Sequence, residues 1–495
     1  MLRLSKSKLI AFRQCPKRLW LEIHQPELRD DSASEMVFAI GNQVGEVARR
    51  IYDTKGVGRL IDVNEIGWDT AFSETSAWLA GTPAPLFEAA IRIEGALALA
   101  DVMLPEPNGA GLRWHMIEVK SSTAVKDYHR EDLAIQAYIA TSAGIDLASA
   151  SVAHVDNSFV YPGGADYRGL LKAVDLTEET LGLAGEVASW IAEAQVVAAL
   201  AAEPEIETGP QCSDPFGCPF LHHCDRAKPT TEFPLSSLHR LGYRKREELE
   251  ALGYDDLRNI PDEQLSPVNL RIKSQSLSGE AWFDAEGAVA DLAPHTGTAY
   301  FLDFETIGFG VPIWKGTRPY QQLPFQFSLH IVSANGEMEH QEFLDLSGED
   351  PGEAFARALI DHCGTAGPVF VYNAAFENRI MRELATRLPS LGPDLHAIID
   401  RVVDLLPIAR NRYYHPDQHG SWSIKAVLPA VCPDLAYAAL DGVQDGQAAQ
   451  GAFLEAMAPD TTSERRTEIE RQLLAYCKLD TLAMVRLWEF FRGRA

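Results

Sequence analysis

The stretch Tyr300-Phe301-Leu302-Asp303-Phe304-Glu305-Thr306 organises the second half of the chain. Its aromatic and aliphatic residues predict a buried strand. Because side chains alternate along a strand, Asp303 and Glu305 would leave one face while Phe304 leaves the other. Two carboxylates this close cannot both stay ionised unless a cation lies between them. The alternative is an edge strand whose acids face water, and the later chain argues against it.

Two later stretches add what such a strand needs to hold a pair of divalent metal ions. Residues 368–373 predict a second strand that runs into a helix carrying Glu377. Apolar residues at helical spacing predict another helix over 471–490, with Tyr476 and Asp480 one turn apart on one face. Tyr476 would orient the attacking water. The predicted oxygen shell suits Mg²⁺ or Mn²⁺ rather than zinc and consists of Asp303, Glu305, Glu377 and Asp480.

Three spaced motifs resemble, in this order, the exonuclease motifs of the DnaQ-like superfamily: Asp303-x-Glu305, Asn373-x-x-x-Glu377 and Tyr476-x-x-x-Asp480. The tyrosine of the third motif is similar to that of the DEDDy branch, which includes proofreading exonucleases and ribonuclease D. For residues 297–495 the resemblance implies a ribonuclease H-like α/β fold and hydrolysis of nucleic acid from 3′ ends by a two-metal mechanism. The second motif departs from the family, because it ends in Phe376-Glu377 where Phe-Asp is usual.

The composition is that of a soluble globular chain with ample core. Its 495 residues, 46% of them hydrophobic, suggest roughly three domains. The N-terminus lacks a signal-peptide core and no apolar run reaches membrane-spanning length, so we expect a cytoplasmic protein without membrane contacts. A net charge of −26 is unusual for a nucleic-acid enzyme, and it implies a local basic channel on an acidic body.

Four cysteines suggest a metal or cluster site in the first half of the chain. A basic amphipathic helix predicted over 4–21 carries Cys15 near its middle or end, and Cys212, Cys218 and Cys224 follow much later. In a cytosolic chain, cysteines do not predict disulfides. Four thiolates can bind zinc or an iron–sulfur cluster, and in a zinc site a histidine can replace one of them. The candidate histidines are His222 and His223. The other cysteines are expected in apolar cores: Cys363, Cys432 and Cys477.

Between these cysteines the sequence predicts a hairpin. Extended runs over 86–95 and 98–104 precede a turn over 105–111 that is rich in Pro and Gly, and a further strand covers 114–120. A helix follows over 131–143.

The hairpin carries a second group of candidate catalytic residues. Asp101 lies on its middle strand, while Glu118 and Lys120 leave the same face of the last strand. Two acids and a lysine at one end of a hairpin can bind a metal and position a water against a phosphodiester. Glu-x-Lys on an exposed strand is also common without any function. Gln136 lies on the helix that follows.

Over residues 1–228 these features together resemble a RecB-like PD-(D/E)xK nuclease. The residues that carry the resemblance are Ser5-x-Ser7, Cys15-Pro16, Asp101, Glu118-Val119-Lys120, Gln136, Cys212, Cys218 and Cys224. The resemblance is narrower to the branch with a four-cysteine [4Fe-4S] cluster, which includes the AddB nuclease domain and the CRISPR-adaptation exonucleases. It implies a restriction-endonuclease-like α/β fold, a metal on Asp101 and Glu118, and an iron–sulfur cluster rather than zinc on the four cysteines.

This module departs from its relatives at a metal ligand. Many relatives carry a metal-binding His where this chain has Gly45, and Glu46 or Glu88 would have to replace it. Without a replacement the site would cut slowly, or the module would bind nucleic acid without cutting it.

Residues 229–296 predict a helical linker, either helix-hairpin-helix-like or a plain spacer with a solvated charged face. In the module that follows, Lys425 could meet a phosphate and Trp422 could stack on a terminal base, or both could be packing residues. Asp404 would be an acid near the metals or a helix cap.

As a whole the chain resembles a bacterial family, defined by a domain of unknown function, that pairs these two modules. We expect a nuclease that acts on single-stranded or end-containing DNA, in DNA processing, repair or defence against foreign DNA. The alternative is a nucleic-acid-binding protein whose N-terminal module is an inactive clamp, with one exonuclease site that acts on RNA.

Overall fold

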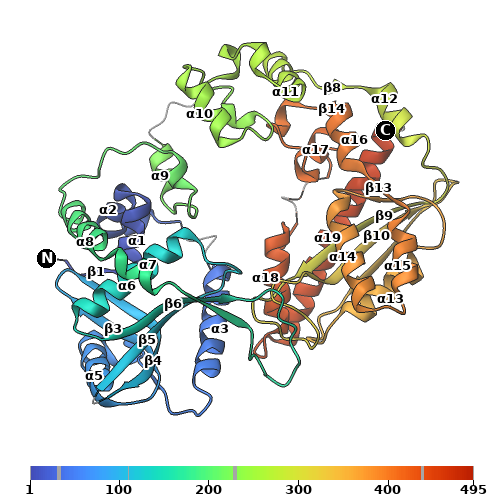
Figure 1. Cartoon of the computed structure of the whole chain (residues 1–495). Helices are drawn as coiled ribbons and strands as arrows, with labels where there is room; N and C mark the ends of the chain where they lie inside the picture. The colour runs from blue at the N-terminus through green and yellow to red at the C-terminus, as the bar shows by residue number, and fades with distance from the viewer. Residues whose placement is uncertain are drawn as a thin grey trace. The chain divides into compact units, whose positions relative to one another are not determined.

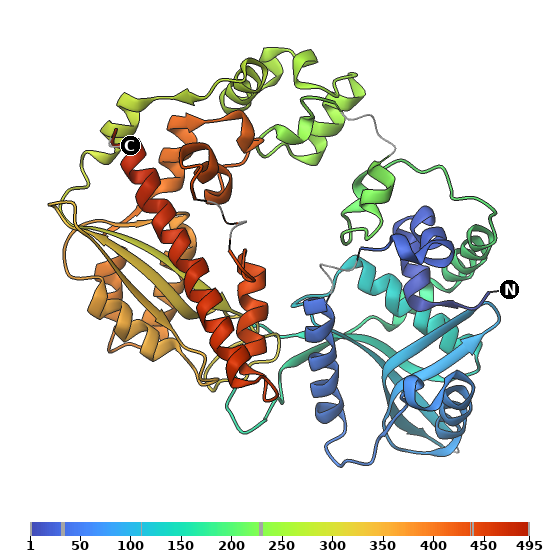
Figure 2. The same ribbon diagram turned by 180° about the vertical axis from the view of Figure 1, so that it is seen from behind.

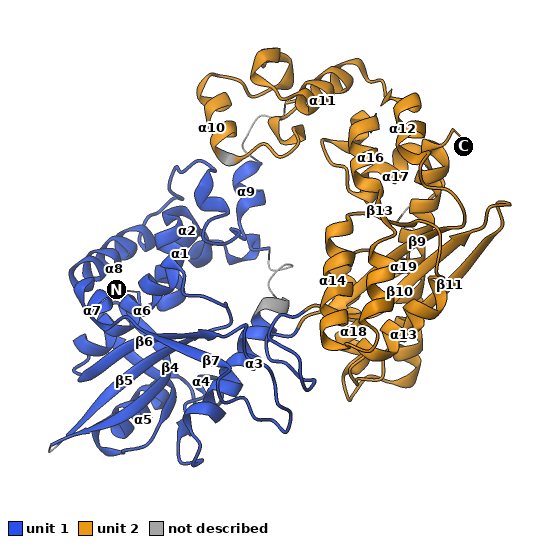
Figure 3. Ribbon diagram, turned by 45° about the vertical axis from the view of Figure 1, so that its right-hand side comes forward, with its two compact units in different colours: residues 1–229, 309–321 blue, residues 230–308, 322–495 orange. Residues whose placement is uncertain are grey.

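The computed structural model describes residues 2–30, 35–109, 111–226, 231–435, 437 and 440–493. They form a multidomain α/β protein with mixed sheets, as the sequence predicts at this level. The chain divides into two compact units (Figure 3): unit 1 is Met1–Pro229 with Phe309–Gln321, and unit 2 is Thr230–Gly308 with Gln322–Ala495. Among the described residues, no helix combines the length and apolar character that a membrane crossing requires.

Unit 1 is built on a seven-stranded sheet of order β2-β3-β4-β5-β6-β7, with β1 paired to β4. Its first elements are β1 (Leu4–Ser5), α1 (Lys6–Gln14), α2 (Pro16–His24), η1 (Pro26–Leu28), α3 (Glu35–Tyr52), β2 (Arg59–Leu60), α4 (Val63–Ile66), α5 (Trp68–Gly81), β3 (Leu86–Ile93) and β4 (Ala96–Asn108). The others are β5 (Gly111–Lys120), α6 (Asp127–Ser142), β6 (Leu147–Val155), β7 (Leu171–Asp175), α7 (Thr177–Gly182), α8 (Ala184–Ala198), η2 (Pro210–Cys212) and α9 (Leu221–Asp225).

The predicted hairpin is present, but its turn is shorter than expected. β4 continues through both prolines, and Pro105 pairs with Trp114. β3 pairs with β4 only between Ala96 and Met103. Beyond Met103, β4 pairs with β5 on one side and with no described strand on the other. A strand that is free on one side tolerates proline, because the missing N–H faces no acceptor.

The single helix expected over residues 4–21 is two helices that meet at Cys15. Cys15 is extended, with φ −163° and ψ 120°, and Pro16 is the first residue of α2. Proline disfavours a helical conformation at the residue before it, yet suits the first position of a helix. Cys15 is therefore held at a corner.

Unit 2 contains a five-stranded mixed sheet of order β11-β10-β9-β12-β13. Elements before the sheet are η3 (Leu235–Ser237), α10 (Tyr243–Ala251), η4 (Leu257–Asn259), η5 (Asp262–Gln264), α11 (Pro267–Ser278), β8 (Trp282–Phe283) and α12 (Ala285–Leu292). The sheet region contains β9 (Ala299–Ile307), β10 (Leu323–Val332), β11 (Met338–Leu344), α13 (Gly352–His362), β12 (Val369–Val371), α14 (Ala374–Arg387), α15 (Gly392–Ile399) and β13 (Val402–Asp404). The last elements are α16 (Leu405–Arg412), β14 (Tyr413–Tyr414), η6 (Pro416–Gln418), α17 (Ile424–Val431), α18 (Gly446–Met457) and α19 (Ser463–Phe491).

Helices cover both faces of this sheet. Figures 1 and 2 show α13, α14 and α15 on one face and α18 and α19 on the other. β9 lies in the middle, antiparallel to β10 and parallel to β12. Because this central strand is covered on both faces, Phe301, Leu302 and Phe304 are all buried although they alternate along it.

The sequence predicts a linker over 229–296. The described part of this stretch, from residue 231 onward, belongs to unit 2. Leu249, Leu257 and Ile260 are buried in one cluster with Phe301 and Trp488. The described part of this stretch contains α10, α11, α12, the short strand β8 and three 3₁₀ turns. Its apolar side chains thus continue the core of the sheet domain.

Unit 1 includes a segment from the second half of the chain, the connection between β9 and β10. Val311 is buried with Val44, Val155 and Leu170. The Tyr320 hydroxyl donates a hydrogen bond to the carbonyl oxygen of Ser121, directly after β5. Unit 1 is therefore not one continuous stretch of chain.

We expect Gly367→Ala to destabilise unit 2 more than Gly336→Ala does. Both glycines have a left-handed backbone, with φ +90° and +89°. A Cβ at Gly367 would lie 2.1 Å from the Thr298 carbonyl oxygen, whereas a Cβ at Gly336 meets nothing within 4 Å. The strained φ costs about 1 kcal/mol in both variants, and the clash adds about 1 to 3 kcal/mol. Urea unfolding followed by circular dichroism measures the difference, and equal losses would contradict the packing described for this loop.

Candidate functional site

Two of the predicted acids leave the same face of β9. Asp303 pairs with Ser328 and Glu305 with Gln326 of β10, so both point toward the helices on one side. Their carboxylate oxygens and the Cys477 sulfur lie within 4.8 Å of one another. Cys477 is buried, as predicted, but not in apolar surroundings, since its Sγ lies 3.8 Å from Asp303 Oδ2.

α19 brings the third motif to the same place. Tyr476 and Asp480 lie one turn apart on this helix, and both are buried. The Tyr437 hydroxyl donates a hydrogen bond to Asp480 Oδ1 at 2.5 Å. Sequence reasoning missed Tyr437, because it lies in a stretch with no motif between Pro433 and Gly442.

α14 supplies the fourth acid. Asn373 caps this helix in a left-handed conformation, with φ +89°, and Glu377 follows one turn later, 3% exposed. Glu377 Oε2 is buried and has no hydrogen-bond partner among the described residues. The sequence leaves two roles open for Asp404, an acid near the metals or a helix cap. Asp404 is a cap, since it accepts hydrogen bonds from the amides of Asn373 and Ala374 at 3.0 Å.

The four carboxyl groups are held at high electrostatic cost. Burial, followed by repulsion from Asp480, raises the pKa of Asp303 well above its usual range and that of Glu305 to about 8. Burial also raises the pKa of Glu377 to about 8. For Asp480 burial raises the pKa to about 6, although the hydrogen bond from Tyr437 counteracts it. A divalent cation would relieve this repulsion.

These residues fit a hard divalent cation. The cluster offers carboxylate oxygens, one of which is buried without a partner, and carboxylates are the ligands that Mg²⁺ and Mn²⁺ prefer. Burial and the charge of Asp303 raise the pKa of the Cys477 thiol well above its usual range. Mg²⁺ and Mn²⁺ prefer oxygen to sulfur ligands, so Cys477 is a neighbour of the acids rather than part of the shell.

The positive charge of Lys425 acts on two acids of this cluster. Its Nζ lies 5.0 Å from the centre of the Tyr476 ring and 5.1 Å from that of Tyr437. Its charge lowers the pKa of both Glu305 and Asp480 in part. The proposed stacking role of Trp422 is wrong, because this side chain is 3% exposed and its Nε1 donates to the Tyr413 carbonyl.

The Glu-x-Lys strand of unit 1 carries a different kind of site. Glu118 accepts hydrogen bonds from Lys6 at 2.7 Å, Lys120 at 2.6 Å and Gln136 at 2.5 Å. Asp132 of α6 also contacts both lysines. Burial alone would raise the pKa of Glu118, but the two lysines lower it well below its usual range. Lys6 and Asp132 were not among the predicted site residues, although Lys6 is the middle residue of Ser5-x-Ser7 and Asp132 lies on the predicted helix over 131–143.

The other acids of this site are less well neutralised. Asp101 accepts the amide N–H of Val119 at 2.7 Å, and burial together with Glu118 raises its pKa well above the usual range. Glu88 lies on β3 between Phe87 and Ala89, which pair with the neighbours of Asp101 on β4. Its φ is +55°, and burial and Glu118 also raise its pKa. Of the two proposed replacements for the missing His, Glu88 is therefore at the site. Glu46 is exposed and pairs with Arg50.

A metal fits this site less readily than it fits unit 2. Both oxygens of Glu118 are engaged, Oε1 by Lys6 and Lys120 and Oε2 by Gln136. An ion on Asp101 and Glu118 would have to displace one of these groups. The lysines already supply positive charge where the relatives are expected to hold a metal.

The four cysteines gather at the end of unit 1. Gln14, beside Cys15, donates from Nε2 to the carbonyl oxygens of Gln211 and Phe216, both at 2.7 Å, which ties α1 to the later cysteine loop. Burial raises the pKa of Cys218 and raises that of Cys224 to about 11. No three of the four sulfur atoms lie within 4.8 Å of one another. In a tetrahedral zinc site the distance between two sulfur ligands is roughly 4 Å.

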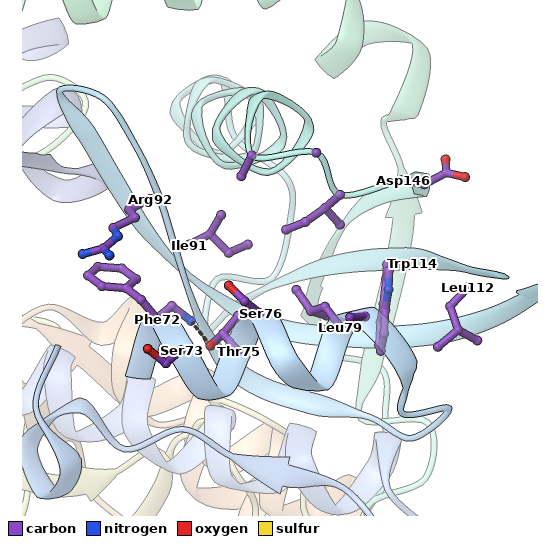
Figure 4. A pocket seen from close by; sticks show the side chains of 15 residues that line it. Phe72, Ser73, Thr75, Ser76, Leu79, Ile91, Arg92, Leu112, Trp114 and Asp146 are labelled. Atoms are coloured by element: carbon purple, nitrogen blue, oxygen red, sulfur yellow. Dashed lines mark hydrogen bonds between the residues drawn. The ribbon is translucent and has the colours of Figure 1, made fainter. Parts of the chain in front are cut away.

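Two of the cavities among the described residues lie in unit 1. The larger, of about 1220 Å³, joins the Glu-x-Lys site to the cysteine loop and is lined by Lys6, Lys120, Tyr128, Phe216 and Cys218 among others. The other, of about 680 Å³, lies between α5, β3 and β5 (Figure 4), and neither the acids nor the cysteines named above line it.

One family profile matches the chain. The family described as Domain of unknown function (DUF2779) matches residues 300–423, about a quarter of the chain. The match includes Asp303, Glu305 and Glu377 and ends before Tyr476 and Asp480. No curated protein and no solved structure matches the chain.

We expect the metal-free protein to lose stability as the pH rises. Glu305 and Glu377 have folded pKa values of about 8, above the ordinary value of 4.5. Between these values the folded state binds more protons than the unfolded state, so the stability gained below pH 4.5 is lost as the pH passes through 8. The loss is on the order of a few kcal/mol.

Melting temperatures in EDTA, measured from pH 5 to pH 9, test this expectation. The slope should flatten in Glu305→Gln/Glu377→Gln and on addition of Mn²⁺, but persist in the exposed control Glu353→Gln. An unchanged slope in the double variant would contradict the assignment.

Proposed function

We propose that unit 2 is a Mg²⁺- or Mn²⁺-dependent 3′-to-5′ exonuclease that acts on DNA. The observation that carries the proposal is that Glu305 of β9, Glu377 of α14 and Asp480 of α19 all act electrostatically on Asp303, whose carboxylate oxygen lies within 4.8 Å of that of Glu305. The order and spacing of the motifs resemble the DnaQ-like superfamily. A mixed sheet covered by helices on both faces supports a ribonuclease H-like fold.

The residues around the acids have separate tasks in this reaction. When bound, Mg²⁺ or Mn²⁺ would supply positive charge to the scissile phosphate and to the attacking water. Burial and Asp480 raise the pKa of Tyr476, so its hydroxyl keeps its proton at neutral pH and can orient that water. Tyr437 fixes the Asp480 carboxylate through its hydrogen bond. Lys425 is placed to balance negative charge on a phosphate.

For unit 1 we propose a RecB-like PD-(D/E)xK module whose nuclease activity is weaker than that of unit 2. Asp101, Glu118, Lys120 and Gln136 are its candidate catalytic residues. The adjoining cavity of about 1220 Å³ combines cationic and aromatic side chains, a combination that suits single-stranded nucleic acid. The alternative is a clamp that holds the strand without cutting it, and the engaged oxygens of Glu118 favour this alternative.

We also propose a [4Fe-4S] cluster on Cys15, Cys212, Cys218 and Cys224. The resemblance to the branch with a four-cysteine cluster supports a cluster over a single zinc ion. It would fasten α1 to the end of unit 1. The whole protein would then process DNA ends in repair or in defence against foreign DNA, with RNA as the alternative substrate.

Asp303→Ala should abolish the stepwise shortening of a 5′-labelled single strand. Loss of a metal ligand should slow the reaction by more than about a hundredfold, whereas Asp361→Ala, on the exposed side of α13, should leave it unchanged. Matched DNA and RNA strands identify the substrate. Undiminished shortening by Asp303→Ala would rule out this site.

The same assay separates the two modules. A strand with a blocked 3′ end cannot enter the exonuclease site, so any cleavage of it must come from unit 1. Such cleavage should survive Asp303→Ala and disappear in Asp303→Ala/Lys120→Ala. If the blocked strand stays intact at every manganese concentration, unit 1 is a clamp.

Protein purified without oxygen should be brown and contain iron and sulfide in about equal amounts, because each cluster carries four of each. Cys15→Ser should lose the colour, while Cys432→Ser, at the end of α17 in unit 2, should keep it. Colourless protein with one stoichiometric zinc would show the closed tetrahedral alternative.

A further inference from the structure

A third cavity, of about 560 Å³, lies within unit 2. It is formed by segments that are far apart in the sequence: the stretch after η3, the start of α14, α16 and the loop before α17. The side chains that matter here are those of His239, Arg240, Asn373, Arg410, His419 and Ser423. The exonuclease motifs contribute only Asn373 to it.

The walls of this cavity are fixed by hydrogen bonds and close packing. His239 Nδ1 lies 3.1 Å from the Gly420 carbonyl oxygen, and the His239 amide donates to Asn269 Oδ1 at 2.8 Å. The edge of the His239 ring meets the buried Trp422 ring at 5.1 Å between centroids. A Cβ at Gly420 would lie 2.0 Å from the Ser237 carbonyl oxygen. The loop before α17 and the stretch after η3 therefore pack so closely that only glycine fits at position 420.

Two arginines bring unneutralised positive charge to the cavity. Within the described residues, neither Arg240 nor Arg410 has a hydrogen bond or ion pair from its guanidinium group. Burial lowers the pKa of His239, and the charges of both arginines lower it further, so both lie close to this ring. In a chain of net charge −26, where Arg412 for example pairs with two aspartates, such a pair of cations favours an anionic ligand.

The backbone at the rim is strained. Arg240 and His419 have φ values of +47° and +45°, a left-handed conformation that non-glycine residues rarely adopt. Strain of this kind persists where the surrounding structure enforces it, and it is concentrated at ligand-binding positions. It places both side chains at the cavity.

The cavity adjoins the acid cluster through two helices. Asn373 lines it, and Glu377 lies one turn further along α14. Ile424 also lines it, and the next residue, Lys425, reaches the rings of Tyr476 and Tyr437. Two helices thus each contribute one residue to this cavity and a nearby one to the acid site.

We propose that this cavity binds a backbone phosphate of the strand whose 3′ end lies at the acid cluster, through Arg240 and Arg410. The proposal rests on the proposed exonuclease function. It assigns the stretch from 231 to 296 a part in substrate binding rather than the role of a spacer. A free nucleotide offers the same phosphate chemistry, and the experiment distinguishes the two sources.

The test compares the full-length variant Arg240→Ala/Arg410→Ala with the charge-matched control Arg357→Ala/Arg486→Ala, whose arginines pair with glutamates on their own helices. For a single-stranded DNA substrate we expect KM to rise about tenfold at unchanged kcat, and the slope of log KM against log salt to fall by about 1. Hydrolysis of the p-nitrophenyl ester of thymidine 5′-monophosphate, which has no second phosphate, should stay at the wild-type rate.

Several outcomes would overturn the proposal. They are an unchanged KM and salt slope in the cavity variant, an equal rise in KM in the control, or an equal loss of ester hydrolysis. Thymidine 5′-monophosphate should compete only at the acid cluster. If instead the cavity variant abolishes its binding, the cavity is a nucleotide site and not a strand contact.

A binding experiment separates this proposal from the exonuclease function. A short single strand with 5-bromouracil near its 3′ end, irradiated on metal-free protein, should crosslink to peptides within 231–246 or 410–424. Crosslinks confined to other peptides overturn the inference even if the protein degrades DNA. Crosslinks here, with no degradation by the wild type, would retain a strand-binding cavity and remove the proposed function.

Discussion

The gathering of the half-buried Asp303 with the buried Glu305, Glu377 and Asp480 is the constraint on which unit 2 depends. Burial disfavours the ionised form of each group, and the charges of the other three acids further disfavour the ionisation of Asp303. The sheet nevertheless holds them there, because Asp303 and Glu305 lie on its central strand and α14 and α19 pack beside it. The apolar core therefore supplies the free energy that keeps the acids together. A cation that neutralises them would add stability as well as chemistry.

Unit 1 meets the same problem in another way. Its Glu118 is as deeply buried as the acids of unit 2, but the ammonium groups of Lys6 and Lys120 lie against it. A buried carboxylate that is paired in this way stays ionised without a metal. The two units thus carry similar residue types with opposite electrostatic outcomes. The acids of unit 2 keep protons that a metal ion can displace, whereas Glu118 of unit 1 is ionised and paired with two ammonium groups.

What the sequence could predict was set by local geometry. Alternation along β9 placed Asp303 and Glu305 on one face, and helical spacing placed Tyr476 beside Asp480. Lys6 and Tyr437 could not be found in this way, because they reach their acids across more than 40 residues, through folding alone. The stretch from 231 to 296 was misjudged for the same reason. Its helices carry many polar residues, which is typical of a linker. Their apolar side chains are buried in a cluster with Phe301, and this contact cannot be read from the sequence.

The segment between β9 and β10 has a consequence for how the protein is made. Val311 and Tyr320 complete the packing of unit 1, yet they follow the first strand of the central sheet of unit 2. On the ribosome, domains generally fold in order as the chain emerges. Here the first unit must wait, with an apolar surface open, until the chain has been synthesised past Gln321. During that interval β9 has already emerged, and its paired acids are without the helices that later enclose them.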